Sequence, residues 1–255
     1  MAPPALRPLS VGEILDVSFQ LYRRHFPALA MVALLCSGFP VILSLFIQAS
    51  GGMFQHFWLA LAYYGIFVIL SAIATAATVF IVSESYLGRP LGAAEALSRA
   101  TPLLWRLIAC SILTGLLVMI GFILFVIPGF ILLCGLVLAF PVLVLEKDTT
   151  ANAALSRSWA LTRGSRWRIF GLLVTLGLLL YIPIIALTTL ATILLPSGEP
   201  GSAATGGLVA LATAGVVQLF LYPLFYCVLT VAYYDLRVRK EAFDLEVLAQ
   251  TLQTA

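Results

Sequence analysis

Charged side chains are scarce in this sequence. Of its 255 residues, 14 are Lys or Arg and 11 are Asp or Glu, so charged residues make up 10% of the chain and hydrophobic residues 62%. A soluble globular domain carries about 25% charged residues. So little charge cannot cover a water-exposed surface, and the composition therefore excludes a soluble protein and predicts an integral membrane protein.

Uncharged runs are long enough to cross a bilayer. Residues 107–145 form one run of 39 residues without a charge. At about 1.5 Å per residue, a single helix of this length would be nearly twice as long as the hydrocarbon core is thick, about 30 Å. The run must therefore fold back on itself, and the Pro-Gly pair at 127–129 is the expected turn. The same length test predicts an all-α fold with six transmembrane helices, at 26–48, 57–82, 104–126, 130–145, 169–195 and 207–234.

The basic residues predict an orientation. In a six-span arrangement all 14 Lys and Arg residues fall on one side, and cytoplasmic loops are the ones that retain Lys and Arg. We therefore expect a multi-pass protein of the bacterial cytoplasmic (inner) membrane with both termini in the cytoplasm and an uncleaved first span. We call the basic residues at the cytoplasmic ends of the spans the basic collar. Trp105, Trp159 and Trp167 are expected in the aromatic belt at the same interface.

Side chains that could support catalysis are few. The two histidines, His25 and His56, fall on opposite sides of the predicted membrane, and the four cysteines all lie within apolar spans. No GxSxG, HExxH, Walker A or dinucleotide-binding glycine pattern is present. We therefore expect no catalytic residue, metal, cofactor or nucleic-acid partner.

A repeated motif divides the chain. "ALSR" occurs at 96–99 and at 154–157, and in both places a Trp-Arg pair follows at the start of a span; "VGEILDVSFQLYRRHF" near the N-terminus is a more divergent copy. Each copy is expected to be an interfacial amphipathic helix followed by a transmembrane hairpin. The prediction is a single membrane domain, 1–255, with repeats at about 9–83, 91–146 and 150–234 and a cytoplasmic tail at 235–255.

Four arginines in the third copy have two interpretations. The simpler one is that they anchor the chain where an interfacial helix becomes a span, with charged heads reaching the aqueous interface. The alternative is a cytoplasmic anion site for lipid headgroups or phosphodiesters. The residues concerned are Arg157, Arg163, Arg166 and Arg168.

Three acidic residues end the even-numbered spans at the predicted cytoplasmic edge: Glu84, Glu146 and Asp235. A carboxylate near the membrane midplane would indicate a proton or ion path. Because these three lie beside the basic collar instead, we interpret them as partners in structural ion pairs.

Three helix-weakening residues lie at matched depth in the first span of each repeat. They are Pro40, Gly121 and Pro183, each 15 or 16 residues beyond an arginine. Broken helices at matched positions can frame a substrate cavity in transporters. Kinks that allow the repeats to pack explain the same pattern.

Three segments carry a family resemblance: "LRPLSVGEILDVSFQLYRRHF" (6–26), "FPVLVLEKDTTANAALSRSWALTRGSRWRIFGLLV" (140–174) and "YYDLRVRKEAFDLE" (233–246). Together they resemble the membrane domain of the prokaryotic glycerophosphoryl diester phosphodiesterase family. In members that bear this name, the membrane domain precedes a soluble catalytic barrel. The resemblance implies a stand-alone membrane module without that barrel.

The expected function is therefore a non-enzymatic one. The sequence favours a scaffold or lipid-interacting protein whose basic collar faces membrane phospholipids or a cytoplasmic protein partner. The alternative is a small-solute transporter or channel with a cavity between the repeats, framed by Pro40, Gly121 and Pro183.

Overall fold

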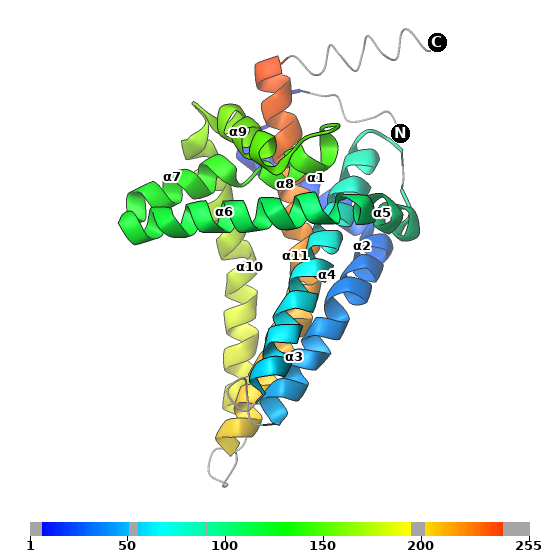
Figure 1. The fold of residues 1–255 in the computed structure, drawn as a ribbon, viewed down its shortest axis with the longest axis vertical. Coiled ribbons are helices and arrows are strands. Elements are labelled where there is room, and N and C mark those ends of the chain that lie inside the picture. The colour runs from blue at the N-terminus through cyan, green and yellow to red at the C-terminus, as the bar shows by residue number, and fades with distance from the viewer. Residues whose placement is uncertain (1–6, 51–55, 90, 195–201, 242–255) are drawn as a thin grey trace.

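The fold is helical throughout the part of the chain that the computed structural model describes, residues 7–50, 56–89, 91–194 and 202–241 (Figure 1). The elements are α1 (Val11–Arg24), α2 (Phe26–Ala33), a π-helical turn (Leu34–Gly38), α3 (Phe39–Ala49), α4 (Phe57–Tyr86), α5 (Ala93–Ala100), a 3-10 turn (Thr101–Leu103), α6 (Leu104–Leu124), α7 (Val126–Leu136), α8 (Ala139–Leu145), α9 (Ala151–Thr162), α10 (Arg166–Leu194) and α11 (Ser202–Glu241).

Six helical stretches are long and apolar enough to cross a membrane. They are Phe26–Ala49, Phe57–Tyr86, Ala93–Leu124, Val126–Leu145, Arg166–Leu190 and Ala212–Glu241. The all-α fold class and the six apolar stretches predicted from the sequence are confirmed. The predicted tail begins inside α11, which continues without a break to Glu241, and the rest of the tail lies outside the described residues.

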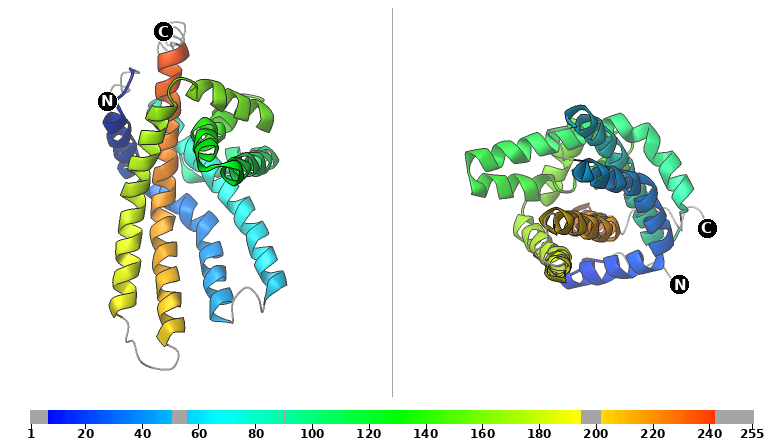
Figure 2. Two further views of the ribbon diagram at one scale, coloured as in Figure 1. Left: turned by 90° about the vertical axis from the view of Figure 1, so that its left-hand side faces the viewer. Right: turned by 90° about the horizontal axis from the view of Figure 1, so that it is seen from below.

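The long helices take two directions. Helices α3, α4, α10 and α11 run roughly alongside one another, whereas the hairpin of α6 and α7 lies across them (Figure 1). The turned views in Figure 2 agree, since α6 and α7 are seen nearly end-on when the other helices are seen lengthwise. The hairpin crosses the bundle near the end where α1, α5 and α9 gather, which we call the collar end.

The hairpin turns two residues earlier than the Pro-Gly pair predicts. Helix α6 ends at Leu124, Phe125 is extended with φ −165° and ψ 155°, and α7 begins at Val126. Pro128 therefore lies in the first turn of α7, where a backbone N–H has no intrahelical partner and its loss is tolerated. The expected turn at 127–129 was wrong because proline suits a helix start as well as a turn.

Close contact between two glycines holds the hairpin together. A Cβ placed on Gly121 would come within 3.0 Å of the Cα of Gly129 and 2.6 Å of Cδ1 of Leu132. Small residues at such positions let two helices approach closely, which is how helices associate in an apolar solvent. Gly121 is therefore a packing residue of the α6–α7 hairpin.

Helices α1 and α9 each precede a pair of long stretches, whereas α5 forms the beginning of the stretch Ala93–Leu124. Helix α1 begins with a capping box, in which Glu13 N–H donates to the Ser10 side chain and Ser10 N–H donates to Glu13. The Ser10 backbone and side chain, followed by Arg7, lower the pKa of Glu13 to about 2. Helix α9 has Thr150 as its N-cap. The three-repeat organisation stays a prediction, because the α6–α7 hairpin is not placed like the other helix pairs.

Helices α4 and α11, the two central helices, both contribute buried residues to the core. Ala72, Ala74, Ala76 and Ala77 of α4 are buried, and α11 supplies large buried residues such as Tyr233. The Ser83 and Tyr234 hydroxyls are hydrogen-bonded to each other at 2.6 Å. This central pair is the frame to which the collar-end residues are attached.

Candidate functional site

Asp235 joins three parts of the chain at the collar end. Its side chain is 1% exposed. One carboxylate oxygen accepts from the backbone N–H of Leu9 at 2.7 Å, and the other accepts from Nη1 of Arg168 at 2.7 Å. Arg239 Nε lies 3.2 Å from both oxygens, and the Leu9 carbonyl accepts from both arginines. Asp235 therefore ties the N-terminal segment to α10 and α11, and Arg168 has a buried carboxylate partner that it shares with Arg239.

Glu146 and Arg157 form a second internal pair. Arg157 Nε donates to Glu146 at 3.0 Å, and its Nη2 lies 2.5 Å from Glu241 at the end of α11. The Tyr233 hydroxyl also donates to Glu146, at 3.1 Å. Arg157 thus lies between two carboxylates and carries little net charge toward a ligand.

Glu84 lies in a more exposed ion pair. Arg99 reaches Glu84 at 3.3 Å and Glu95 at 2.6 Å, and the Arg99 side chain is 43% exposed. Pairs this exposed contribute at most about 1 kcal/mol. Each of the three acidic residues named from the sequence therefore contacts an arginine.

The remaining two arginines, Arg163 and Arg166, have no carboxylate partner among the residues that the structure describes. Arg163 is exposed, and its backbone makes two hydrogen bonds: its N–H donates to the Ala160 carbonyl and its own carbonyl accepts from Lys240. The guanidinium of Arg166 lies over the ring of Trp159, 3.8 Å from the centroid. Its Nε is buried and has no hydrogen-bond partner. Among the described residues, two of the four arginines thus have carboxylate partners and two do not.

The position of Trp159 is fixed by the contact between α9 and α7. Gly135 of α7 leaves the space for the indole, since a Cβ there would approach Cζ3 of Trp159 to 2.5 Å. The hydroxyls of Ser158 and Thr162 both donate to the Gly135 carbonyl, at 2.8 and 3.3 Å. Trp159 therefore docks α9 on α7, and its place in the aromatic belt stays a prediction.

The loop between α9 and α10 places Arg166 next to Trp159. Gly164 has φ +82°, a left-handed conformation that glycine adopts without strain. Helix α10 begins two residues later at Arg166. Arg166 is thus placed against Trp159 by the turn that starts α10.

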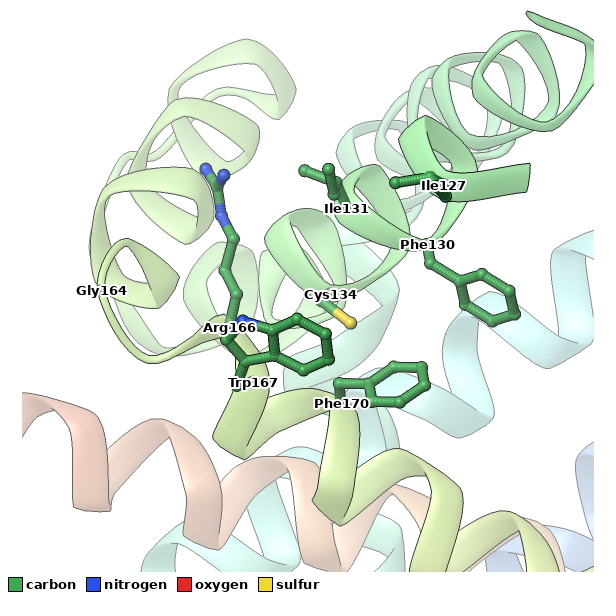
Figure 3. Close-up of a pocket in the computed structure, with 8 residues that line it drawn as sticks. All are labelled: Ile127, Phe130, Ile131, Cys134, Gly164, Arg166, Trp167 and Phe170. Atoms are coloured by element: carbon green, nitrogen blue, oxygen red, sulfur yellow. The ribbon is translucent and has the colours of Figure 1, made fainter. Parts of the chain in front are cut away.

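A cavity of about 520 Å³ opens beside Arg166. It is lined by Ile127, Phe130, Ile131, Cys134, Gly164, Arg166, Trp167 and Phe170 (Figure 3). The volume lies within the range of about 300–1,000 Å³ that is typical of ligand sites. Arg166 is the one charged residue in an otherwise apolar wall, so the cavity suits a ligand with an anionic end and an apolar body.

The aromatic residues of this cavity pack on one another. The ring centroids of Phe130 and Phe170 are 5.6 Å apart, and those of Trp167 and Phe170 are 6.0 Å apart, both in edge-on geometry. Trp167 is 87% exposed and Trp105 is 77% exposed. Exposed tryptophans of this kind are typical of a membrane interface.

Two further cavities lie between the long helices. One, of about 240 Å³, is lined by Pro40 and by hydroxyl-bearing residues such as Ser71 and Tyr222, and no charged residue lines it. The other, of about 410 Å³, lies between α7, α10 and α11, where Tyr222 and Tyr181 are its only hydroxyl-bearing lining residues.

The three helix-weakening residues lie in different surroundings. Pro40 is buried beside the smaller cavity, Gly121 is buried in the α6–α7 hairpin, and Pro183 is exposed on α10. None of the three cavities is lined by Gly121 or Pro183. These three cavities therefore do not bring the three residues together, since the hairpin that carries Gly121 lies across the bundle, and a cavity framed by all three stays a prediction.

Comparison with known proteins gives a family. The model of the membrane domain of glycerophosphoryl diester phosphodiesterase matches residues 108–252, which is more than half of the chain and includes α9 and all four arginines. No match was found among curated proteins or among solved structures. On the extent of the family match, the chain belongs to the glycerophosphoryl diester phosphodiesterase membrane-domain family.

Proposed function

We propose that this chain is a non-enzymatic multi-pass module of the bacterial cytoplasmic membrane that binds anionic phospholipid at its basic collar. In this arrangement both termini lie in the cytoplasm. The observation that carries the proposal is the division of the arginines: Arg157 and Arg168 pair with carboxylates, whereas Arg163 and Arg166 have no carboxylate partner in the described part of the chain. The family match supports a role without catalysis, since the matched model describes a membrane domain.

Charge and location together support a lipid headgroup as the partner. Arginine binds phosphate through paired, charge-assisted hydrogen bonds. A basic side chain near an anionic membrane surface contributes about 1 kcal/mol to binding. Trp167, which follows Arg166 directly, is almost fully exposed, as expected at the headgroup level. Arg163 and Arg166 are thus available where phosphate groups would be.

The test compares lipid preference in two matched variants. The protein is reconstituted in nanodiscs of phosphatidylcholine alone or mixed with phosphatidylglycerol, and its unfolding midpoint is measured. The test variant is Arg163→Gln/Arg166→Gln. The control is Arg7→Gln/Arg99→Gln, which removes the same formal charge from two exposed arginines that already pair with carboxylates.

We expect phosphatidylglycerol to stabilise the unmodified protein and the control, and to lose this effect in the test variant. Two arginines at about 1 kcal/mol each correspond to about 2 kcal/mol, which shifts the midpoint of a protein of this size by about 4–8 °C. Equal stabilisation of both variants would contradict the proposal. In a scaffold role the same arginines would dock a cytoplasmic protein, and the midpoint would then not depend on the lipid headgroup.

A small-solute transporter is the second candidate, and the cavity beside Pro40 favours it. Its polar lining consists of hydroxyl groups without charge, which suits an uncharged polar solute better than an ion. The test is the swelling rate of proteoliposomes in xylitol, with Ser71→Leu as the variant that fills the cavity. A rate equal to that of protein-free liposomes would exclude this function for xylitol-sized solutes.

A further inference from the structure

The cavity beside Arg166 has the properties of a site for one particular kind of molecule. Its walls are isoleucine and aromatic side chains from α7 and α10, and its one charge is the Arg166 guanidinium. In Figure 3 the guanidinium lies at one end, directed away from Trp167 and Phe170, and Phe130 and Phe170 line the other end. An occupant that satisfies both ends has an anionic head and a long alkyl chain.

The Arg166 guanidinium is held in place and has a hydrogen-bond donor without a partner. Its Nε is buried without a hydrogen bond, and a buried donor left in this state destabilises the protein. The stacking contact with Trp159 holds the plane of the guanidinium in place. A guanidinium binds a phosphate or carboxylate through two parallel hydrogen bonds along one edge of its plane, and no carboxylate among the described residues pairs with Arg166.

Neighbouring charges favour an anion at this end of the cavity. Arg163 is exposed and directly precedes Gly164, which lines the cavity. The nearby carboxylates Glu146 and Asp235 are occupied by Arg157, Arg168 and Arg239. An anion arriving beside Arg166 would therefore meet positive charge that no described carboxylate compensates.

We infer that the cavity between α7 and α10 holds one alkyl chain of an anionic amphiphile whose phosphate or carboxylate head pairs with Arg166. The inference rests on the proposed function and deepens it, because a general attraction to anionic lipid requires no bound chain. Two sources share this chemistry: an anionic phospholipid with one chain in the cavity, and a free fatty acid.

The experiment is native mass spectrometry of the purified, partly delipidated protein. Three variants are compared with the unmodified protein: Arg166→Gln removes the charge, Ile131→Trp fills the cavity and keeps the charge, and Leu178→Trp adds the same bulk at an exposed position of α10 that lines none of the cavities described above. Thermal unfolding checks that each variant is folded.

We expect one retained amphiphile per chain in the unmodified protein and in Leu178→Trp. Retention should fall at least tenfold in Arg166→Gln and in Ile131→Trp. Added dihexadecanoyl phosphatidylglycerol should restore occupancy at concentrations at which dihexanoyl phosphatidylglycerol does not. Added palmitate forms the second arm, and the mass of the retained molecule tells which source is bound.

The outcomes separate the inference from the proposed function. Full retention in Arg166→Gln would overturn the inference. A second outcome combines full retention in Ile131→Trp with loss of the phosphatidylglycerol preference in Arg163→Gln/Arg166→Gln. It would show that the collar binds lipid but that the cavity does not hold the alkyl chain, and would overturn the inference. Loss of the chain in both variants, with no headgroup preference in nanodiscs, would leave the cavity site standing and overturn the more general proposal.

Discussion

Replacing Asp235 with asparagine tests how the collar end is held together. Asparagine has nearly the same shape and keeps an oxygen that can accept from the backbone N–H of Leu9. It removes the negative charge that faces Arg168 and Arg239. The change therefore isolates the charge from the packing.

The magnitude follows from the burial of the three side chains. Removing one partner of a buried ion pair destabilises a protein by about 3–5 kcal/mol. The Asp235 side chain is 1% exposed, but those of Arg168 and Arg239 are 22% and 37% exposed, and water can solvate them in part. The low end of the range, about 3 kcal/mol, is therefore expected, which corresponds to a midpoint about 6–12 °C lower in a protein of this size.

The assay is the unfolding midpoint in one detergent, measured for Asp235→Asn and for the control Asp16→Asn. Asp16 is an exposed residue of α1 with no ion-pair partner in the described part of the chain, so its replacement should leave the midpoint within about 2 °C. The double variant Asp235→Asn/Arg168→Gln should be less destabilised than the sum of the two single variants, because they break the same pair. Equal midpoints for Asp235→Asn and Asp16→Asn would refute a structural role for the buried charge.

Three further predictions concern packing, pH and the hairpin. Gly135→Ala should destabilise the protein by about 1–3 kcal/mol because its methyl group meets Trp159, whereas Gly115→Ala, with no atom within 4 Å, should be neutral or slightly stabilising, as measured by thermal unfolding. Glu13 has a pKa of about 2 in the folded protein against an ordinary 4.5, so its contribution to the start of α1 is present above pH 4.5 and declines as the pH falls toward 2. Hydrogen exchange of the first α1 amides, corrected for intrinsic rates, should show this loss of protection, and unchanged protection down to pH 2 would contradict it. A spin label in place of Phe125 at the hairpin turn should report the membrane depth of the collar end, and a depth matching the far ends of α3 and α4 would contradict the crossed arrangement.

The apolar stretches could be predicted from the sequence because length and composition decide them. The run at 107–145 is too long for one span and must contain a turn. Capping signals also act locally, which is why the start of α1 at Val11 follows from Ser10 and Glu13. These predictions need no knowledge of distant contacts.

The direction of the α6–α7 hairpin could not be predicted. Its residues are apolar on every side, so no amphipathic stripe shows which face packs against the bundle. The contact that positions it is between Gly135 and Trp159, which lie far apart in the sequence. A glycine in a helix and a tryptophan at an expected interface give no signal that they meet.

Sequence patterns also do not show which of the four arginines pair with carboxylates. Arg157 and Arg168 have similar sequence surroundings to Arg163 and Arg166, and all four fit an anchoring role. Their difference depends on carboxylates that arrive from α8 and α11, among them Glu146 and Asp235. Only the fold shows which arginines keep their charge.

The most direct test of lipid binding beside Arg166 is photo-cross-linking in a bilayer. The probe is phosphatidylglycerol with a diazirine in the middle of one acyl chain, and the labelled peptides are identified by mass spectrometry. Labelling should concentrate on residues 126–134 of α7 and 166–170 of α10, and unlabelled phosphatidylglycerol should suppress it more strongly than phosphatidylcholine. Labelling spread evenly over the exposed apolar faces of α3, α6 and α10, suppressed equally by both lipids, would contradict a specific site.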